Sequence, residues 1–172
     1  MRIIDQLREV IEYLKPHKKF LLDTFEEENN KFKKLFATDH DLIGRVLKCH
    51  LVLEQYLNQY LIYHFGDQID GANLSFYQKA KLIPDDDLRA KFVKEGILKL
   101  NSIRNRFSHN LDAEVDIHEL DSMLEVLNIT REEIDYEDPV RVIQDFTTVG
   151  CTFLLINEEL DELFVEAFKQ IH

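Results

Sequence analysis

Apolar residues recur at intervals of three and four along most of the chain, the spacing of one face of an α-helix. This spacing predicts an amphipathic helix over residues 2–14 and a second helical stretch over 20–36. Strict alternation of apolar and polar residues is not sustained anywhere, and no repeat of fixed length occurs. We therefore predict an all-α protein, a bundle of roughly five to seven helices.

The longest uninterrupted helical pattern lies over residues 38–66. Thr38, followed three residues later by an aspartate, resembles a capping box at the start of a helix, and Gly66 is a suitable C-terminal stop. We expect this segment to form the central helix of the bundle. His50 and His64 lie on it, and each is expected to be a partly buried or surface histidine rather than a metal ligand.

Two further helix starts follow in the sequence. Ser75 with Gln78 forms a capping box for a short helix that ends before Pro84. The aspartates at 85–87 offer N-caps to the next helix, whose apolar spacing continues across Gly96.

The last third of the chain predicts two more helices. One starts near Asp116, with Glu119 three residues later, and the other runs from about Val140 to the end of the chain. In terms of organisation, we expect residues 1–37 to be an N-terminal helical extension and residues 38–172 to form a single helical bundle.

Composition narrows the class of protein. The 172 residues are 45% hydrophobic and 31% charged, which suits one globular domain with a sizeable core. Two cysteines, Cys49 and Cys151, are too few for a disulfide framework or a zinc site, and Cys49 fits the apolar core. The sequence shows neither a signal peptide nor a long apolar run, so we expect a cytoplasmic protein without a membrane partner.

Charge is unevenly distributed. The net charge of −12 excludes a uniformly basic nucleic-acid clamp. Residues 77–106 nevertheless hold eight basic against four acidic residues, whereas residues 112–172 hold 17 acidic and three basic ones. We call the basic residues of the first segment the basic strip: Lys79, Lys81, Arg89, Lys91, Lys94, Lys99, Arg104 and Arg106.

One segment, residues 100–110, combines groups that could carry chemistry: Arg104, Asn105, Arg106 and His109 at the end of a predicted helix. Histidine moves protons near neutral pH, and the planar fork of arginine stabilises charge on phosphate oxygens. Cleavage of RNA by its own 2′-hydroxyl needs both a proton-transfer group and a charge stabiliser. The reaction uses no metal or cofactor, and we expect neither in this protein. The alternative is that these residues only satisfy carbonyls at a helix C-terminus.

The spacing of this pair bears on assembly. Five residues of separation turn His109 about 140° away from Arg104 on an ideal helix. The two side chains converge only if the helix ends before His109, or if a second subunit contributes its own copy. We therefore predict a two-fold homodimer with both motifs at or near the interface.

Arg104-Asn105-x-x-x-His109 resembles the Arg-x(4–6)-His motif of HEPN domains, a family of helical nucleotide-binding domains, in its commonest form with Asn after the Arg. Residues 51–57 resemble the long central helix of that family, and residues 74–82 resemble the short helix after it. The resemblance covers roughly residues 38–170.

The resemblance implies a four-helix bundle with extra helices, which dimerises so that two motifs face each other across a cleft. Many members are metal-independent ribonucleases of toxin–antitoxin, abortive-infection and other defence systems. In these, the residue at Arg104 would steady the phosphate, the residue at His109 would transfer protons, and Asn105 would orient them. Other members, such as the mannitol operon regulator, are non-catalytic.

Two hypotheses follow from the sequence. The first is a HEPN-type endoribonuclease, a toxin with a separate antitoxin protein. The second is a non-catalytic regulatory or scaffolding module that binds a protein or nucleotide in the same cleft. Under the first, Glu54 and Ser108 would support the motif, although Glu54 could simply belong to a polar helix face. RNA would be held by a rim of basic residues, which otherwise are solvated helix faces: Lys79, Lys81, Lys91, Lys94, Lys99 and Arg106.

Overall fold

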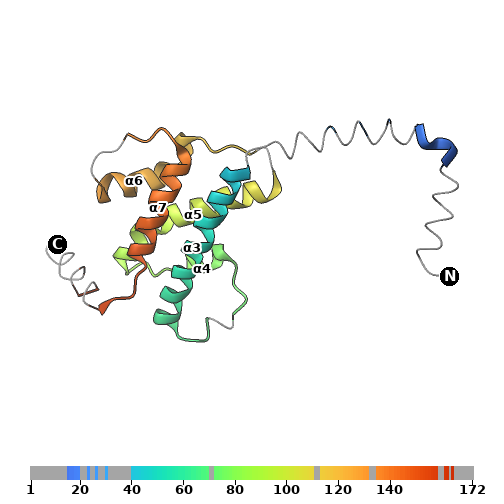
Figure 1. Cartoon of the computed structure of the whole chain (residues 1–172). Coiled ribbons are helices and arrows are strands. Elements are labelled where there is room, and N and C mark those ends of the chain that lie inside the picture. Colours follow the sequence, from blue (N-terminus) through green and yellow to red (C-terminus); the bar gives the residue numbers. More distant parts are fainter. Residues whose placement is uncertain are drawn as a thin grey trace, which may run out of the picture. The chain divides into compact units, whose positions relative to one another are not determined.

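The computed structural model describes residues 40–69, 72–110, 113–131 and 135–158, together with 15–19 and the single positions 23, 26, 30, 161, 162 and 164. No strand occurs among these residues, so the all-α prediction is confirmed (Figure 1). Their helices are, in chain order, η1 (Lys15–His17), α3 (His40–Phe65), α4 (Phe76–Lys81), α5 (Leu88–His109), η2 (Ile117–Glu119), α6 (Asp121–Thr130) and α7 (Pro139–Phe153).

The chain divides into two compact units, Met1–Thr38 and Asp39–His172. In the first unit, the helix predicted over 2–14 lies outside the described residues, as does the one over 20–36 apart from single positions. The helices α3 to α7 all belong to the second unit. No helix in the described part of the chain has the length and apolar character needed to cross a bilayer.

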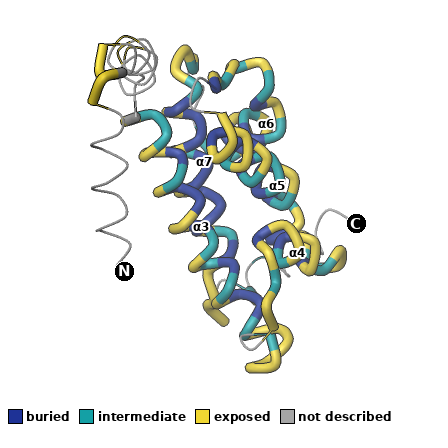
Figure 2. The backbone as a smooth tube through the Cα atoms, turned by 90° about the vertical axis from the view of Figure 1, so that its right-hand side faces the viewer, coloured by how far each residue is buried: buried dark blue, intermediate teal, exposed yellow. Residues whose placement is uncertain are grey.

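The central helix α3 is the longest described element, at 26 residues. It ends where Gly66 adopts a positive φ of 76°, a conformation that glycine tolerates without steric cost. The N–H of Gly66 donates a hydrogen bond to the Ile62 carbonyl. Its buried face, which includes Leu53, Leu57 and Tyr60, packs against α7 and α5. In Figure 2 the buried positions of α3 and α7 lie where the two helices run beside each other.

Two N-terminal caps form as the sequence predicts. The Ser75 hydroxyl accepts from the Gln78 N–H at 3.3 Å while the Gln78 side chain accepts from the Ser75 N–H at 2.8 Å, which starts α4. Of the three aspartates before α5, Asp87 is the cap, and its Oδ1 accepts from the Ala90 N–H at 3.0 Å. These local rules therefore fix the starts of both α4 and α5.

Two boundaries differ from the prediction. The capping box of Asp116 and Glu119 starts only the 3-10 turn η2, and α6 begins at Asp121 because the buried Leu120 leaves helical backbone geometry. The last helix, α7, ends at Phe153 rather than at the end of the chain. Arg89, which is only 6% exposed, donates a hydrogen bond from Nη2 to the Leu155 carbonyl at 2.9 Å. This tertiary contact stands where the next helical turn would begin.

Candidate functional site

The helix α5 carries the whole motif and runs without interruption through His109. Asn110 is the C-cap, and its N–H still bonds the Arg106 carbonyl at 3.0 Å. Of the two ways in which Arg104 and His109 could meet, an earlier helix end is therefore excluded. Five helical positions separate the pair by about 140° around the axis, so within one chain they point to different sides.

Arg104 is half-buried and is held by its neighbour. Its Nη1 donates to Oδ1 of Asn105 at 3.1 Å, whereas its Nε is buried and has no hydrogen-bond partner among the described residues. Ser108 donates from its hydroxyl to the Arg104 carbonyl at 3.0 Å, which supports the last turn of the helix rather than the guanidinium. His109 is exposed at the end of α5. The motif thus presents one partly anchored guanidinium and one accessible imidazole.

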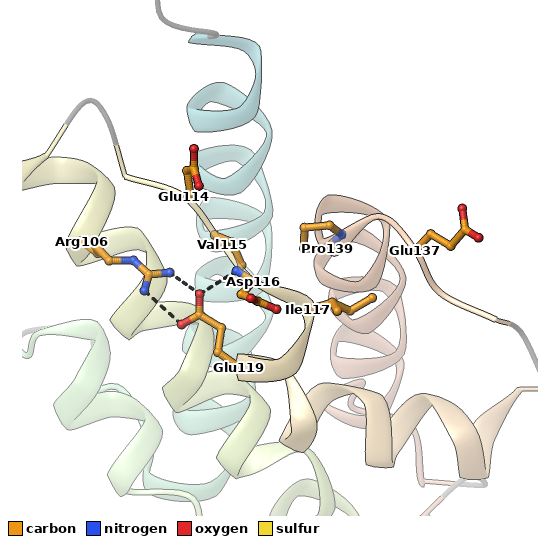
Figure 3. Close-up of a pocket in the computed structure, with 8 residues that line it drawn as sticks. All are labelled: Arg106, Glu114, Val115, Asp116, Ile117, Glu119, Glu137 and Pro139. Atoms are coloured by element: carbon orange, nitrogen blue, oxygen red, sulfur yellow. Dashed lines mark hydrogen bonds and ion pairs between the residues drawn. The ribbon is translucent and has the colours of Figure 1, made fainter.

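Part of the basic strip is tied to Glu119 of η2. Arg106 forms a bidentate pair with this carboxylate, at 2.6 and 3.0 Å, and Lys99 lies 3.4 Å from it. The hydrogen bonds from Arg106 hold the pKa of Glu119 at about 2, well below its usual range. Figure 3 shows this pair in a pocket of about 620 Å³ whose other charged lining residues are acidic: Glu114, Asp116 and Glu137. Arg106 therefore lies in an acidic setting.

The remaining lysines of the strip also have partners. Lys94 donates to the Ile83 carbonyl at 2.8 Å, and both Lys94 and Lys91 lie 3.7 Å from the Asp85 carboxylate. Lys81 lies over the Tyr77 ring at 5.6 Å. The structure thus places these cations in internal pairs at the α4–α5 connection, and their role in binding RNA stays a prediction.

Glu54 of α3 faces α4. Its carboxylate accepts from Lys79 at 2.9 Å and lies 4.0 Å from Nδ1 of His50. In the described part of the chain it forms no ion pair with Arg104 or His109. Its connection to the motif is indirect, because the Glu54 carboxylate and the Arg104 charge both act on the imidazole of His50.

The sequence did not single out His50 as a buried residue of this network. It is 5% exposed, and its ring packs on Phe76 with centroids 4.1 Å apart. Its Nε2 has no hydrogen-bond partner in the part of the chain that the structure describes. Burial lowers the pKa of His50 most, the Glu54 charge raises it, and the Arg104 charge lowers it further. The sequence signal that could have indicated this pairing is the position of His50 four residues before Glu54, because this spacing places both side chains on one face of α3.

Arg104 differs from most of the basic strip. Within the described residues, only Arg104 and Lys81 among the eight cations have neither an acidic side chain nor a backbone carbonyl as partner. Arg89, the last of the eight, pairs with Asp161 at 2.7 Å. The guanidinium of the motif therefore keeps a charge that no carboxylate of the described chain neutralises.

Replacing Glu119 with glutamine should lower the free energy of unfolding by about 1–2 kcal/mol at pH 7, because it removes a charged hydrogen-bonded pair and weakens the η2 cap. Denaturant unfolding measures this difference. Since the pKa of Glu119 is lowered, the wild-type advantage exists above pH 4.5 and is lost as the pH falls toward 2. Glu125→Gln, at an exposed position of α6, controls for the change in net charge; an equal effect there would contradict the prediction.

In the described part of the chain, no three His, Cys, Asp or Glu side chains lie together as metal ligands would. Comparisons of the chain with protein-family models, with curated proteins and with solved structures found no match.

Proposed function

We propose that this chain is a metal-independent endoribonuclease of the HEPN type, in which the 2′-hydroxyl of the RNA attacks the adjacent phosphate. The observation that carries the proposal is the state of Arg104. Among the described residues, its guanidinium is oriented by Asn105 and unpaired by carboxylates, while nearly all other cations of the basic strip are paired internally. An oriented, unneutralised arginine is what a phosphate group in the transition state requires.

Each residue of the motif then has one task. Neutral His109 takes the proton of the 2′-hydroxyl, whose oxygen attacks phosphorus, and the bond from phosphorus to the 5′-oxygen breaks. The 5′-oxygen leaves with the proton that His109 has just taken up, and the other product ends in a 2′,3′-cyclic phosphate. Arg104 stabilises the charge that builds on the phosphate oxygens.

The uninterrupted helix supports a homodimer as part of this proposal. Because Arg104 and His109 of one chain point to different sides of α5, the proposed site pairs the Arg104 of one subunit with the partner's His109. An enzyme that cuts cellular RNA slows growth, so we infer a toxin of a toxin–antitoxin or phage-defence system. Its antitoxin would be a separate protein, and the strongly acidic segment 112–172 suits a basic partner surface.

One observation favours a second candidate, a non-catalytic regulatory or scaffolding module. Lys79, Lys99 and Arg106 are engaged by carboxylates of the same chain, which reduces the positive charge available to RNA. A module that binds a protein or a single nucleotide needs no extended basic surface. The two candidates differ in whether the purified protein breaks an RNA chain.

The substrate's 2′-hydroxyl provides the test. In excess chelator, purified protein should cleave a labelled RNA and leave a 2′,3′-cyclic phosphate, which mass spectrometry identifies. An RNA of the same sequence with 2′-deoxyribose at the cut site should remain intact, because the attacking group is missing. Cleavage that requires a divalent metal, or products with a 5′-phosphate, would contradict the mechanism. No cleavage of any RNA would favour the non-catalytic module.

A further inference from the structure

Among the described residues, three buried nitrogen atoms on the neighbouring helices α3 and α5 lack a hydrogen-bond partner: Nε2 of His50, Nε of Arg104 and Nη1 of Arg89. Arg89 already pairs with Asp161 and the Leu155 carbonyl, which leaves the atoms of His50 and Arg104 without an explanation. The two residues lie close enough for the charge of Arg104 to act on the imidazole. Buried polar atoms are nearly always paired because an unpaired one loses its hydration without compensation. Two such atoms on residues that interact electrostatically therefore point to a bridging group between them.

The two atoms are chemically complementary. Nε of arginine always carries a proton and can only donate. The Glu54 carboxylate lies 4.0 Å from Nδ1 of His50, which favours a proton on Nδ1 and leaves a lone pair on Nε2. Glu54 is itself held by Lys79 at 2.9 Å. Lys79 thus pairs with Glu54, and the charges of Glu54 and Arg104 both act on the imidazole of His50.

Three helices surround the imidazole. Phe76 of α4 packs on its ring, and the side chain of Asn101 on α5 contributes a hydrogen bond that raises the pKa. Burial is the largest influence and lowers the pKa of His50, so the ring is neutral at pH 7. Only the neutral ring can accept a hydrogen bond. The charged groups that act on it from α3, α4 and α5 are Glu54, Lys79 and Arg104.

We propose that His50 is a positioning residue for Arg104: one water bridges them, accepting from the Nε–H of Arg104 and donating to Nε2 of the neutral imidazole. Asn105 already holds Nη1 at 3.1 Å, so the guanidinium becomes fixed at two points and its remaining N–H groups face the phosphate. This rests on the proposed function, because there Arg104 is the group that stabilises the phosphate. His50 itself touches no reacting atom.

Nitrogen-edited NMR of the full chain tests the contact without reference to activity. At pH 7 we expect His50 to carry its proton on Nδ1 and none on Nε2. Arg104→Gln should raise the pKa of His50, because a nearby positive charge that opposes protonation is lost. Arg141→Gln, an exposed arginine of α7, should leave it unchanged. A proton on Nε2, or a pKa that Arg104→Gln does not raise, would overturn the proposal.

A matched pair of isosteres tests the role in the reaction. The amide of glutamine reaches the position of Nε2, whereas that of asparagine reaches only the position of Nδ1. His50→Asn should lower kcat for RNA cleavage by about 10- to 100-fold with little change in KM, since a misplaced guanidinium acts mainly in the transition state. His50→Gln should keep most of the activity.

The outcomes separate the two proposals. If both variants fold by circular dichroism and lose activity equally, or if both stay as active as wild type, His50 does not position Arg104. If wild-type protein cleaves no RNA, the ribonuclease proposal fails. The NMR measurements then decide by themselves whether His50 and Arg104 interact as proposed.

Discussion

Alanine in place of either Arg104 or His109 should reduce RNA cleavage by about 10²- to 10⁴-fold, the usual scale for removing a catalytic acid, base or charge stabiliser. Arg104→Lys should recover little activity, because an ammonium cannot reproduce the bidentate fork that binds two phosphate oxygens. Single-turnover cleavage of a labelled RNA measures these rates. Expression of the wild type should slow growth, and expression of the His109 variant should not.

Controls keep this prediction specific. Both residues lie near the end of α5, so circular dichroism and light scattering of the variants should match the wild type. Arg141→Ala removes an exposed arginine from α7 and should leave the cleavage rate unchanged. Wild-type rates in both motif variants would contradict the proposed site.

Mixing the two inactive variants tests the shared site. If each site combines the Arg104 of one subunit with the partner's His109, a mixed dimer of Arg104→Ala and His109→Ala chains contains one intact site. Activity should then reappear on mixing, toward one quarter of the wild-type level per chain if subunits exchange at random and the two sites act independently. No recovery, despite exchange shown by labelled subunits, would contradict a shared site. A monomer by light scattering at micromolar concentration would do so as well.

Replacing Gly96 with alanine should lower the free energy of unfolding by about 3 kcal/mol, at the upper end for an overpacked core. A Cβ atom at this position of α5 would lie 2.3 Å from two ring atoms of Phe146 in α7. Phe146 is fully buried, so its ring has no free space to move into. Thermal unfolding should show a decrease in Tm of roughly 6–12 °C.

Two matched variants make this test specific. Gly44→Ala, at an exposed position of α3 with open space around it, should stabilise the protein by about 0.5–1 kcal/mol through helix propensity alone. In a double-mutant cycle, Phe146→Leu should relieve part of the cost of Gly96→Ala, since the smaller side chain vacates the ring position. Equal effects of alanine at Gly44 and Gly96 would contradict the close approach of α5 and α7.

The helical pattern of α3 and the starts of α4 and α5 were predictable because they depend on residues three or four positions apart. The apolar spacing of α3, the Ser75 capping box and the Asp87 cap all involve neighbours in the sequence, and each is present in the structure. The two incorrect boundaries are at places where a distant residue intervenes. Leu120 is buried in the core, and Arg89 donates a hydrogen bond to the carbonyl of Leu155, 66 positions away in the sequence.

The sequence by itself determined an all-α chain and identified Arg104, Asn105 and His109 as the group to test. Only the tertiary structure decided which charges remain available, because an ion pair requires two side chains to meet from different helices. It paired Arg106 and Lys99 with Glu119 and brought Glu54 to Lys79. It also buried His50 within reach of the electrostatic influence of Arg104. Helical spacing acts over a single turn, whereas charge pairing and burial depend on how whole helices pack.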